Sequence, residues 1–250
     1  MDQEEAVTAA VLVIGDEILS GRTKDKNIGF IAEYLTSIGI DLKEVRVVPD
    51  EEDEIVAAVN ALRVRYTYLF TTGGIGPTHD DITADSIAKA FGVGISEDER
   101  AIEEMLTRVS RADLTPARLR MARIPHGADL VRNAVSSAPG FRLDNVIVMA
   151  GVPAIMQSMM DYVTPTLRTG KRMLSVSLRA DAREGDVAEP FGLLAKAYPD
   201  VMMGSYPFND EHGYNTNLVL RSRDPDRLAA AKAEVEAMLA ALPGRAGKIP

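Results

Sequence analysis

The chain of 250 residues contains no cysteine and no tryptophan, and aromatic residues make up only 5% of it. The lack of cysteine excludes disulfide bonds, cysteine-ligated zinc, iron–sulfur clusters and thiol catalysis, and it fits a reducing compartment. No apolar run reaches the roughly 18 residues of a membrane-spanning helix. The acidic start of the chain, MDQEE, is unlike a signal peptide. We therefore expect a cytoplasmic protein without a membrane partner.

An excess of positive charge is also missing. The chain has 28 Lys and Arg residues against 37 Asp and Glu residues, which gives a formal net charge of −9. Proteins that bind nucleic acids usually show a basic excess or a basic stripe, so we expect no nucleic-acid partner. An anionic ligand would have to be held locally, by backbone N–H groups at a helix N-terminus and a few nearby cations.

What the sequence does contain is a regular alternation of strand-like and helix-like segments over its first 92 residues. The predicted strands and helices follow one another in pairs: 7–14 and 27–39, 40–48 and 49–65, 66–72 and 81–92. Strands that alternate with helices predict an α/β fold, a mostly parallel sheet with helices on both faces.

The pattern changes near residues 168–172. The segments that follow are read in the order strand, helix, strand, strand and helix, over about 75 residues. This order predicts a small α+β domain. We therefore divide the chain into an α/β domain at 1–170 and a small domain at 171–250.

Three polar motifs follow three of the predicted strands directly. They are GDEIL after the first strand, VPDEEDE after the second and TTGGIGPTHDD after the third. In parallel α/β sheets, ligands bind at the carboxyl ends of the strands, which meet at one edge. We therefore expect the three motifs to form one ligand site.

The glycine loop of the third motif is the first candidate. Gly73, Gly74 and Gly76 allow positive φ angles and a close approach to a ligand, and the N–H groups that enter the next helix can hold phosphate. The spacing matches neither a P-loop nor a dinucleotide fingerprint. The alternative for such a loop is a tight turn without a ligand.

The adjacent carboxylates of Asp80 and Asp81 are the second candidate. Beside an anion they would repel the ligand unless a divalent cation intervenes, so we expect Mg²⁺ or a similar cation at Asp80 and Asp81. One of the two is expected to cap the following helix. We assign capping or support to Asp80 and chemistry to Asp81, and we expect Asp50 to face the same edge.

Six further residues are candidates for ligand or phosphate binding, against the alternative of a solvated loop: Gly15, Asp16, Glu17, Lys24, Asn27 and Thr78. His79 has no second histidine near it in sequence, which argues against a histidine-based metal site. No Ser-His-Asp order and no GxSxG motif is present.

The motifs GDEILSGRTKDKN and TTGGIGPTHDDIT closely resemble the signatures of the molybdopterin-binding domain family, which includes MogA, MoaB and the N-terminal part of CinA. The best match is to the CinA-type branch, whose two patterns are met at Gly15 to Gly21, Asp25, Asn27 and Thr72 to Thr83. The shorter pieces MARIPHGA, APG, GVP and GSYP match as well, so the resemblance covers nearly the whole chain.

This resemblance implies a three-layer α/β/α sandwich followed by the small α+β domain of the CinA type. It implies molybdopterin or a nucleotide as ligand, a divalent cation, and important aspartates at Asp50 and Asp81. For the CinA-type branch it implies metal-dependent cleavage of ADP-ribose-like pyrophosphates, and for MogA-like members the transfer of adenylate to molybdopterin. Relatives of this fold commonly self-associate, so we also expect a homo-oligomer.

The chain departs from the family pattern at several positions. Ile155 stands where the family usually has Glu, and the stretch VRNAVS at 131–136 replaces I-P-N-x-x-G. These changes motivate a third hypothesis, a non-catalytic sensor or scaffold. Because the sequence stops at Pro250, we expect the deamidase activity of full-length CinA to be absent.

Overall fold

The computed structural model describes residues 6–211 and 213–242. The chain divides into two compact units, Met1–Gly170 and Lys171–Pro250. None of the helices in the described part of the chain is long and apolar enough to span a bilayer.

The first unit is built on a six-stranded sheet with the order β2-β1-β3-β8-β7-β6. Four neighbouring strands, β2, β1, β3 and β8, are parallel; β7 runs antiparallel to β8, and β6 runs antiparallel to β7. The bounds in sheet order are Asp41–Val48, Thr8–Ile14, Tyr68–Thr72, Val146–Met149, Gly140–Leu143 and Asp129–Val131. The predicted, mostly parallel sheet is confirmed.

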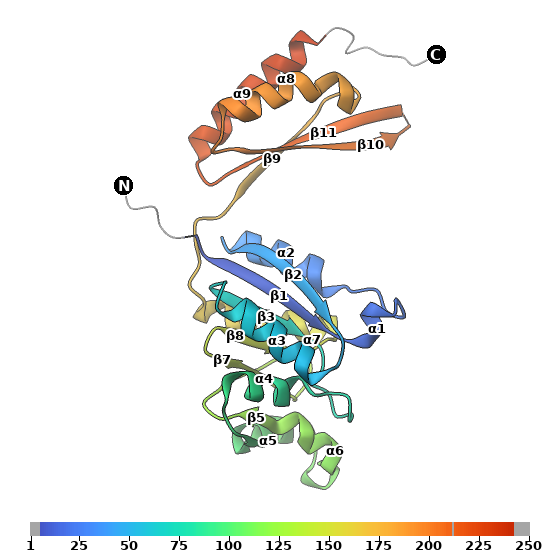
Figure 1. The fold of residues 1–250 in the computed structure, drawn as a ribbon, viewed down its shortest axis with the longest axis vertical. Helices are drawn as coiled ribbons and strands as arrows, with labels where there is room; N and C mark the ends of the chain where they lie inside the picture. Colours follow the sequence, from blue (N-terminus) through green and yellow to red (C-terminus); the bar gives the residue numbers. More distant parts are fainter. Residues whose placement is uncertain (1–5, 212, 243–250) are drawn as a thin grey trace. The chain divides into compact units, whose positions relative to one another are not determined.

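Helices cover both faces of this sheet (Figure 1). Residues of α2 (Asn27–Ser37) and α7 (Pro153–Val163) pack with one set of β1 side chains, and residues of α3 (Glu52–Arg63), α4 (Thr83–Phe91) and α5 (Glu99–Leu106) pack with the other. Alternate side chains of a strand point to opposite faces, and both sets in β1 are apolar and buried. The three-layer α/β/α fold is therefore confirmed.

Local sequence explains where α3 and α4 begin and end. Acidic residues occupy the first turn of α3 and Arg63 its last turn, an order that suits the helix dipole. Lys89 of α4 bonds to Glu52 and, at 3.0 Å, to Asp53, so it links the two helices. Helix α4 ends at Gly92, which has a φ of +65° and takes the left-handed conformation typical of a C-cap.

Several short elements were not expected from the sequence. A short helix, α1 (Asp16–Leu19), lies in a segment that we read as a polar loop. Strands β4 (Ile95–Glu97) and β5 (Arg123–Pro125) form a separate antiparallel ribbon. Strands of three residues and a helix of four carry too little hydrophobic period to be read from sequence. Residues 111–125 are read from the sequence as one short helix, and the structure divides them into α6 (Pro116–Leu119) and the 3-10 turns Arg111–Asp113 and Arg120–Ala122. A further 3-10 turn, Thr164–Thr166, follows α7.

The second unit has a three-stranded antiparallel sheet with the order β10-β11-β9. Its elements in chain order are β9 (Leu174–Arg179), α8 (Glu184–Ala197), β10 (Met202–Asp210), β11 (Gly213–Ser222) and α9 (Pro225–Ala241). Residues of both helices and of the sheet share one hydrophobic core. This is the order of strands and helices that the sequence predicted.

Candidate functional site

The loop that leaves β3 depends on its glycines for its own packing. Gly73 and Gly74 have φ angles of +102° and +66°. A Cβ atom on Gly73 would lie 2.1 Å from the backbone oxygen of Ile14, and one on Gly74 would lie 2.1 Å from Thr83 Oγ1. These positions exclude other residues, because a side chain would strain the backbone and clash with β1 or α4. The glycines therefore have a structural reason that exists without any ligand.

Thr83 ties the same loop to the start of α4. Its N–H group donates to the oxygen of Gly74 at 3.0 Å, and its hydroxyl donates to the oxygen of Gly73 at 3.0 Å. Both bonds are made by a residue that is fully buried. They hold the first half of the loop in one conformation between β3 and α4.

The second half of the loop is closed by Asp81. Its Oδ2 atom accepts hydrogen bonds from the N–H of Thr78 at 2.8 Å and from the hydroxyl of Thr78 at 2.5 Å. Arg120 then donates from Nε to the oxygen of Thr78 at 3.2 Å and from Nη2 to the oxygen of Asp81 at 3.3 Å. Arg120 was not a candidate from the sequence, since it lies 39 positions from Asp81.

The expectation that one aspartate caps α4 is wrong. The N-cap of this helix is Ile82, and no side chain makes a capping hydrogen bond there. The Asp81 carboxylate turns back to Thr78 instead. Asp80 has a side chain that is 64% exposed and lies 3.9 Å from the exposed His79. Hydrogen bonding to Thr78, and then to its own backbone, lowers the pKa of the Asp80 carboxyl, which keeps it ionised.

Hydrogen bonds connect the GDEIL motif with the VPDEEDE motif, and Asp50 accepts one of them. Its Oδ2 atom accepts a hydrogen bond from the N–H of Asp16 at 3.0 Å, and the N–H of Gly15 donates to the oxygen of Val48 at 3.1 Å. Burial raises the pKa of Asp50, and the negative charges of neighbouring Asp16, Glu17 and Asp80 raise it further, against the lowering effect of the Asp16 N–H. Residues of all three strand-end motifs therefore act on one carboxylate.

The raised pKa of Asp50 predicts that Asp50→Asn stabilises the protein at neutral pH. The folded state holds the proton more tightly than the unfolded state does, so ionised Asp50 costs stability above its raised pKa. This loss of stability is absent at pH values below 3.8, the ordinary pKa of an Asp carboxyl. It grows as the pH rises through the raised pKa of Asp50. We expect a gain of a few degrees in Tm at pH 7 that shrinks toward pH 4, measured by calorimetry.

The matched control for this prediction is Asp53→Asn. Asp53 lies in the first turn of α3 with a side chain that is 94% exposed. Neutralising it should give no gain at pH 7. A Tm for Asp50→Asn that stays at or below the wild-type value across the pH range would contradict the destabilising role of the Asp50 charge.

The structure offers no preformed metal cage for the expected divalent cation. In the described ranges, 6–211 and 213–242, no group of three or more His, Asp or Glu side chains is arranged to hold a metal ion. Mg²⁺ commonly binds through one or two carboxylates together with phosphate oxygens of the substrate and water. The carboxylates at the strand ends suit binding of this kind, in which one or two carboxylates hold the cation together with the phosphate oxygens of the ligand.

A cavity of about 250 Å³ lies beside the glycine loop, at the carboxyl ends of β1 and β3. It brings together four of the candidate residues, Glu17, Lys24, Asn27 and Gly73. The remaining lining residues are Val13, Ile14, Ile18, Thr23, Asp25, Lys26, Thr72, Gly151 and Pro153. Two lysines at an otherwise acidic edge give this cavity local cations that suit an anionic ligand.

The sequence DKN sets up one wall of the cavity. Asp25 Oδ1 accepts the N–H groups of Asn27 at 3.0 Å and Ile28 at 2.7 Å, so it satisfies two free donors at the start of α2. Asn27 is buried, and its Nδ2 donates to the oxygen of Gly151 at 2.8 Å. This bond links the first residue of α2 to the loop before α7, a contact that sequence spacing could not reveal.

Two polar atoms of the cavity-lining residues have no partner. Asn27 Oδ1 and Thr72 Oγ1 are buried and make no hydrogen bond in the described part of the chain. Thr72 was read only as part of the motif, not as a site residue. Its position at the last residue of β3, next to Gly73, gives it a place in the cavity.

The other candidate residues lie around this cavity rather than in it. Gly74, Gly76 and Asp81 line a narrower cleft on the α4 side of the loop, which also contains Arg120. Gly15 begins the turn into α1, and Thr78 closes the glycine loop. Gly73 therefore lines the cavity, whereas Gly74, Gly76 and Asp81 line the cleft.

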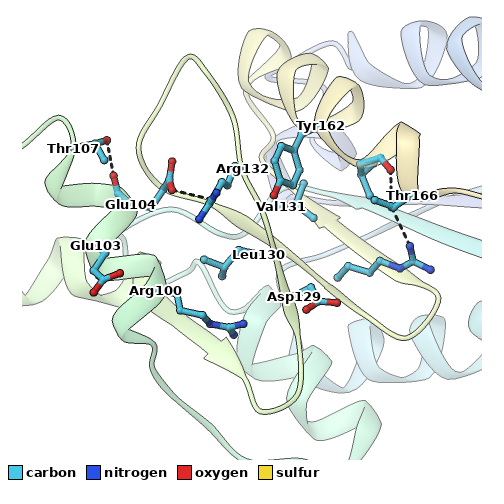
Figure 2. A pocket seen from close by; sticks show the side chains of 12 residues that line it. Arg100, Glu103, Glu104, Thr107, Asp129, Leu130, Val131, Arg132, Tyr162 and Thr166 are labelled. Atoms are coloured by element: carbon cyan, nitrogen blue, oxygen red, sulfur yellow. Dashed lines mark hydrogen bonds and ion pairs between the residues drawn. The ribbon is translucent and has the colours of Figure 1, made fainter.

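A larger hollow of about 600 Å³ lies along the edge strand β6, beside α5 and the end of α7 (Figure 2). Its arginines already have partners. Arg132 Nε bonds to Glu104 Oε2 at 2.9 Å, Arg100 pairs with Asp98, and Arg142 donates to Thr166 Oγ1 at 3.2 Å. None of the candidate residues from the sequence lines it, so we do not assign it to the ligand site.

A parallel α/β sheet with a glycine loop, a polar cavity and carboxylates at one strand edge defines a ligand-binding domain of the doubly wound class. Residues 10–169 match the family described as a probable molybdopterin binding domain. The chain therefore belongs to the molybdopterin-binding domain family, as its motifs suggested. Residues 172–242 match the middle domain of FAD synthase, a relation that the sequence motifs did not indicate.

Similarity to individual proteins agrees with this family assignment. A protein from Archaeoglobus fulgidus is 30% identical over 231 residues, which cover 92% of this chain and 96% of the relative. A probable FAD synthase of Caenorhabditis elegans is 29% identical, and the match covers 93% of this chain but only 50% of that protein. The solved structure of the protein CinA with unknown function from Thermoplasma acidophilum is 36% identical, with a TM-score of 0.61 over 64% of this chain and 98% of that one.

Proposed function

We propose that the first unit binds a nucleotide that contains a pyrophosphate and hydrolyses it with the help of a divalent cation. The observation that carries this proposal is the cavity of about 250 Å³ lined by Lys24, Asn27, Gly73 and Glu17, together with the influence of the Glu17 charge on Asp50. A pyrophosphate needs cations and N–H donors around it, and its cleavage needs charge stabilisation at the bridging oxygen.

The candidate residues have different roles in this proposal. The glycine loop and Lys24 hold the phosphates, with support from Gly15, Glu17, Asn27 and Thr78. Asp81 and Asp50 would hold the cation, Asp80 would be a further metal ligand, and Asp16 positions Asp50 through the 3.0 Å bond from its N–H group. The bound cation supplies the positive charge that stabilises the transition state.

The reaction is a hydrolysis and needs water as its only co-reactant. The oxygen of a water molecule forms a bond to one phosphorus while the bond from that phosphorus to the bridging oxygen breaks. ADP-ribose then gives AMP and ribose 5-phosphate. FAD contains the same linkage and would give AMP and FMN, and its inclusion as a substrate is supported by relatives named probable FAD synthase.

The test is incubation of the full chain with ADP-ribose or FAD in the presence of Mg²⁺ or Mn²⁺, followed by chromatography for AMP. We expect AMP to form with at least one substrate, and to require the cation. Absence of AMP from both substrates under all cations would overturn the pyrophosphatase proposal.

A second candidate function is transfer of adenylate from ATP to molybdopterin. It is favoured by the match of residues 10–169 to a probable molybdopterin binding domain. Tight molybdopterin binding and adenylation without ADP-ribose cleavage would select it. Nucleotide binding without any turnover would instead select a sensor or scaffold. Self-association of the chain stays a prediction, which analytical ultracentrifugation tests.

A further inference from the structure

The turn at residues 78–81 carries Asp80 and Asp81, two of the proposed cation ligands, yet little packing holds it. Residues 77–80 are exposed, so apolar burial does not fix their backbone. The N–H of Asp81 donates to the oxygen of Thr78 at 3.3 Å, and the Asp81 carboxylate accepts from the N–H and the hydroxyl of Thr78. These bonds close the turn on itself, and they do not attach it to another part of the unit.

Arg120 attaches the turn from outside. Its Nε donates to the oxygen of Thr78 at 3.2 Å and its Nη2 to the oxygen of Asp81 at 3.3 Å, so one side chain holds both ends of the turn. The N–H donors of a guanidinium form a planar, rigid fork. Both acceptors are backbone oxygens, although the chain has 37 Asp and Glu residues. The contact therefore fixes backbone geometry rather than pairing charges.

The segment that carries Arg120 is itself firmly held. Ala122, in the same 3-10 turn, is fully buried, and its oxygen accepts the N–H of Asp98 at 2.9 Å. Arg123 bonds to both carboxylate oxygens of Asp85 in α4, at 3.0 and 2.6 Å. Bidentate pairs of this kind fix orientation as well as adding energy. Arg120 therefore connects an exposed turn to a segment that is held by burial and by α4.

We propose that Arg120 is a positioning residue for the reaction of the first unit. By holding the oxygens of Thr78 and Asp81, it fixes the backbone from which the carboxylates of Asp80 and Asp81 project. Such groups need an accurate arrangement, because small displacements lower turnover strongly. Arg120 acts through the two aspartates and does not touch the ligand. The inference rests on the proposed function, in which Asp80 and Asp81 are ligands of the cation.

Three variants separate the contact from the charge. Arg120→Met removes both donors and keeps an unbranched side chain, whereas Arg120→Lys offers a point charge in place of the planar fork. Arg118→Met is the matched control, because Arg118 of the same segment also donates to a backbone oxygen, that of Asp113 at 2.9 Å, instead of the turn. All three should keep Tm close to the wild-type value, because neither arginine is buried.

Hydrogen exchange tests the contact without any ligand. The amide protons of residues 78–82 are followed by mass spectrometry of the full chain. They should exchange about tenfold faster in Arg120→Met and Arg120→Lys than in the wild type, because the bonds that restrain the turn are lost or weakened. Arg118→Met should exchange at the wild-type rate.

Turnover tests the positioning. With ADP-ribose and saturating Mn²⁺, kcat should fall about tenfold or more in both Arg120 variants, while the KM for ADP-ribose stays within about twofold of the wild type. The Mn²⁺ concentration for half-maximal rate should rise in the same two variants. Arg118→Met should match the wild type in all three quantities.

Three results would overturn the inference: wild-type exchange in Arg120→Met, wild-type exchange and turnover in Arg120→Lys, or a raised KM with unchanged kcat. The second would mean that charge alone suffices, and the third would place Arg120 on the ligand itself. Failure of the proposed function gives a different pattern, since the wild type then forms no AMP. The exchange rates would in that case still decide whether Arg120 fixes the turn.

Discussion

Replacing Gly73 with alanine should destabilise the first unit by about 3 kcal/mol, because two costs add. The residue has a φ of +102°, which strains any residue with a side chain. The new Cβ atom would also lie 2.1 Å from the backbone oxygen of Ile14, and a backbone atom in the centre of a sheet cannot move aside cheaply. Because the chain has no tryptophan, calorimetry is the suitable measurement.

Gly92→Ala is the control that separates the two costs. Gly92 has a φ of +65°, and a Cβ atom there would meet nothing within 4 Å. Its substitution should cost only the conformational strain, about 1 kcal/mol. Equal losses in the two variants would mean that the contact with Ile14 does not constrain the glycine loop.

The fold could be predicted because the sequence repeats one kind of signal. Apolar runs such as 7–14 and amphipathic segments such as 27–39 alternate regularly, and such long periodic segments identify parallel α/β sheets. The order of elements in residues 171–250 followed in the same way. The short helix Asp16–Leu19 was missed, since four residues cannot show a period.

Convergence of the strand-end motifs also followed from topology. The bond between the N–H of Asp16 and Asp50 Oδ2 joins residues 34 positions apart, as expected for the ends of neighbouring parallel strands. The order of the strands does not determine the direction in which each side chain points. Asp81 turns toward Thr78 in its own loop, a choice that depends on local hydrogen bonding rather than on strand order.

The cavity could not be predicted from the sequence, because it depends on a contact between residues that are far apart in the chain. It needs the contact between Asn27, the first residue of α2, and Gly151 in the loop before α7, which lie 124 positions apart. The motif DKN marked Asn27 as a candidate, but nothing in the sequence shows that one amide atom would be used and the other left without a partner. Unpartnered atoms are visible only after all their neighbours are known.

Asp81→Asn should lower the hydrolysis of ADP-ribose by about 100-fold or more while leaving Tm nearly unchanged. Loss of a charge that stabilises a transition state typically has this effect on turnover. The fold should survive, because the asparagine Oδ1 atom can accept the same hydrogen bonds that Thr78 donates to Asp81 at 2.8 and 2.5 Å. Initial rates of AMP formation at saturating cation provide the measurement, with Asp53→Asn as the exposed control.

Asp81→Ala completes the comparison, because it removes the charge and the loop-closing acceptor together. If both variants lose turnover and only the alanine variant loses Tm, the negative charge of Asp81 acts on the ligand or its cation. If Asp81→Asn keeps wild-type turnover, the charge is dispensable and Asp81 serves only to close the loop at Thr78. The chemistry would then have to rest on Asp50, the carboxylate that receives the N–H of Asp16 and whose pKa burial raises.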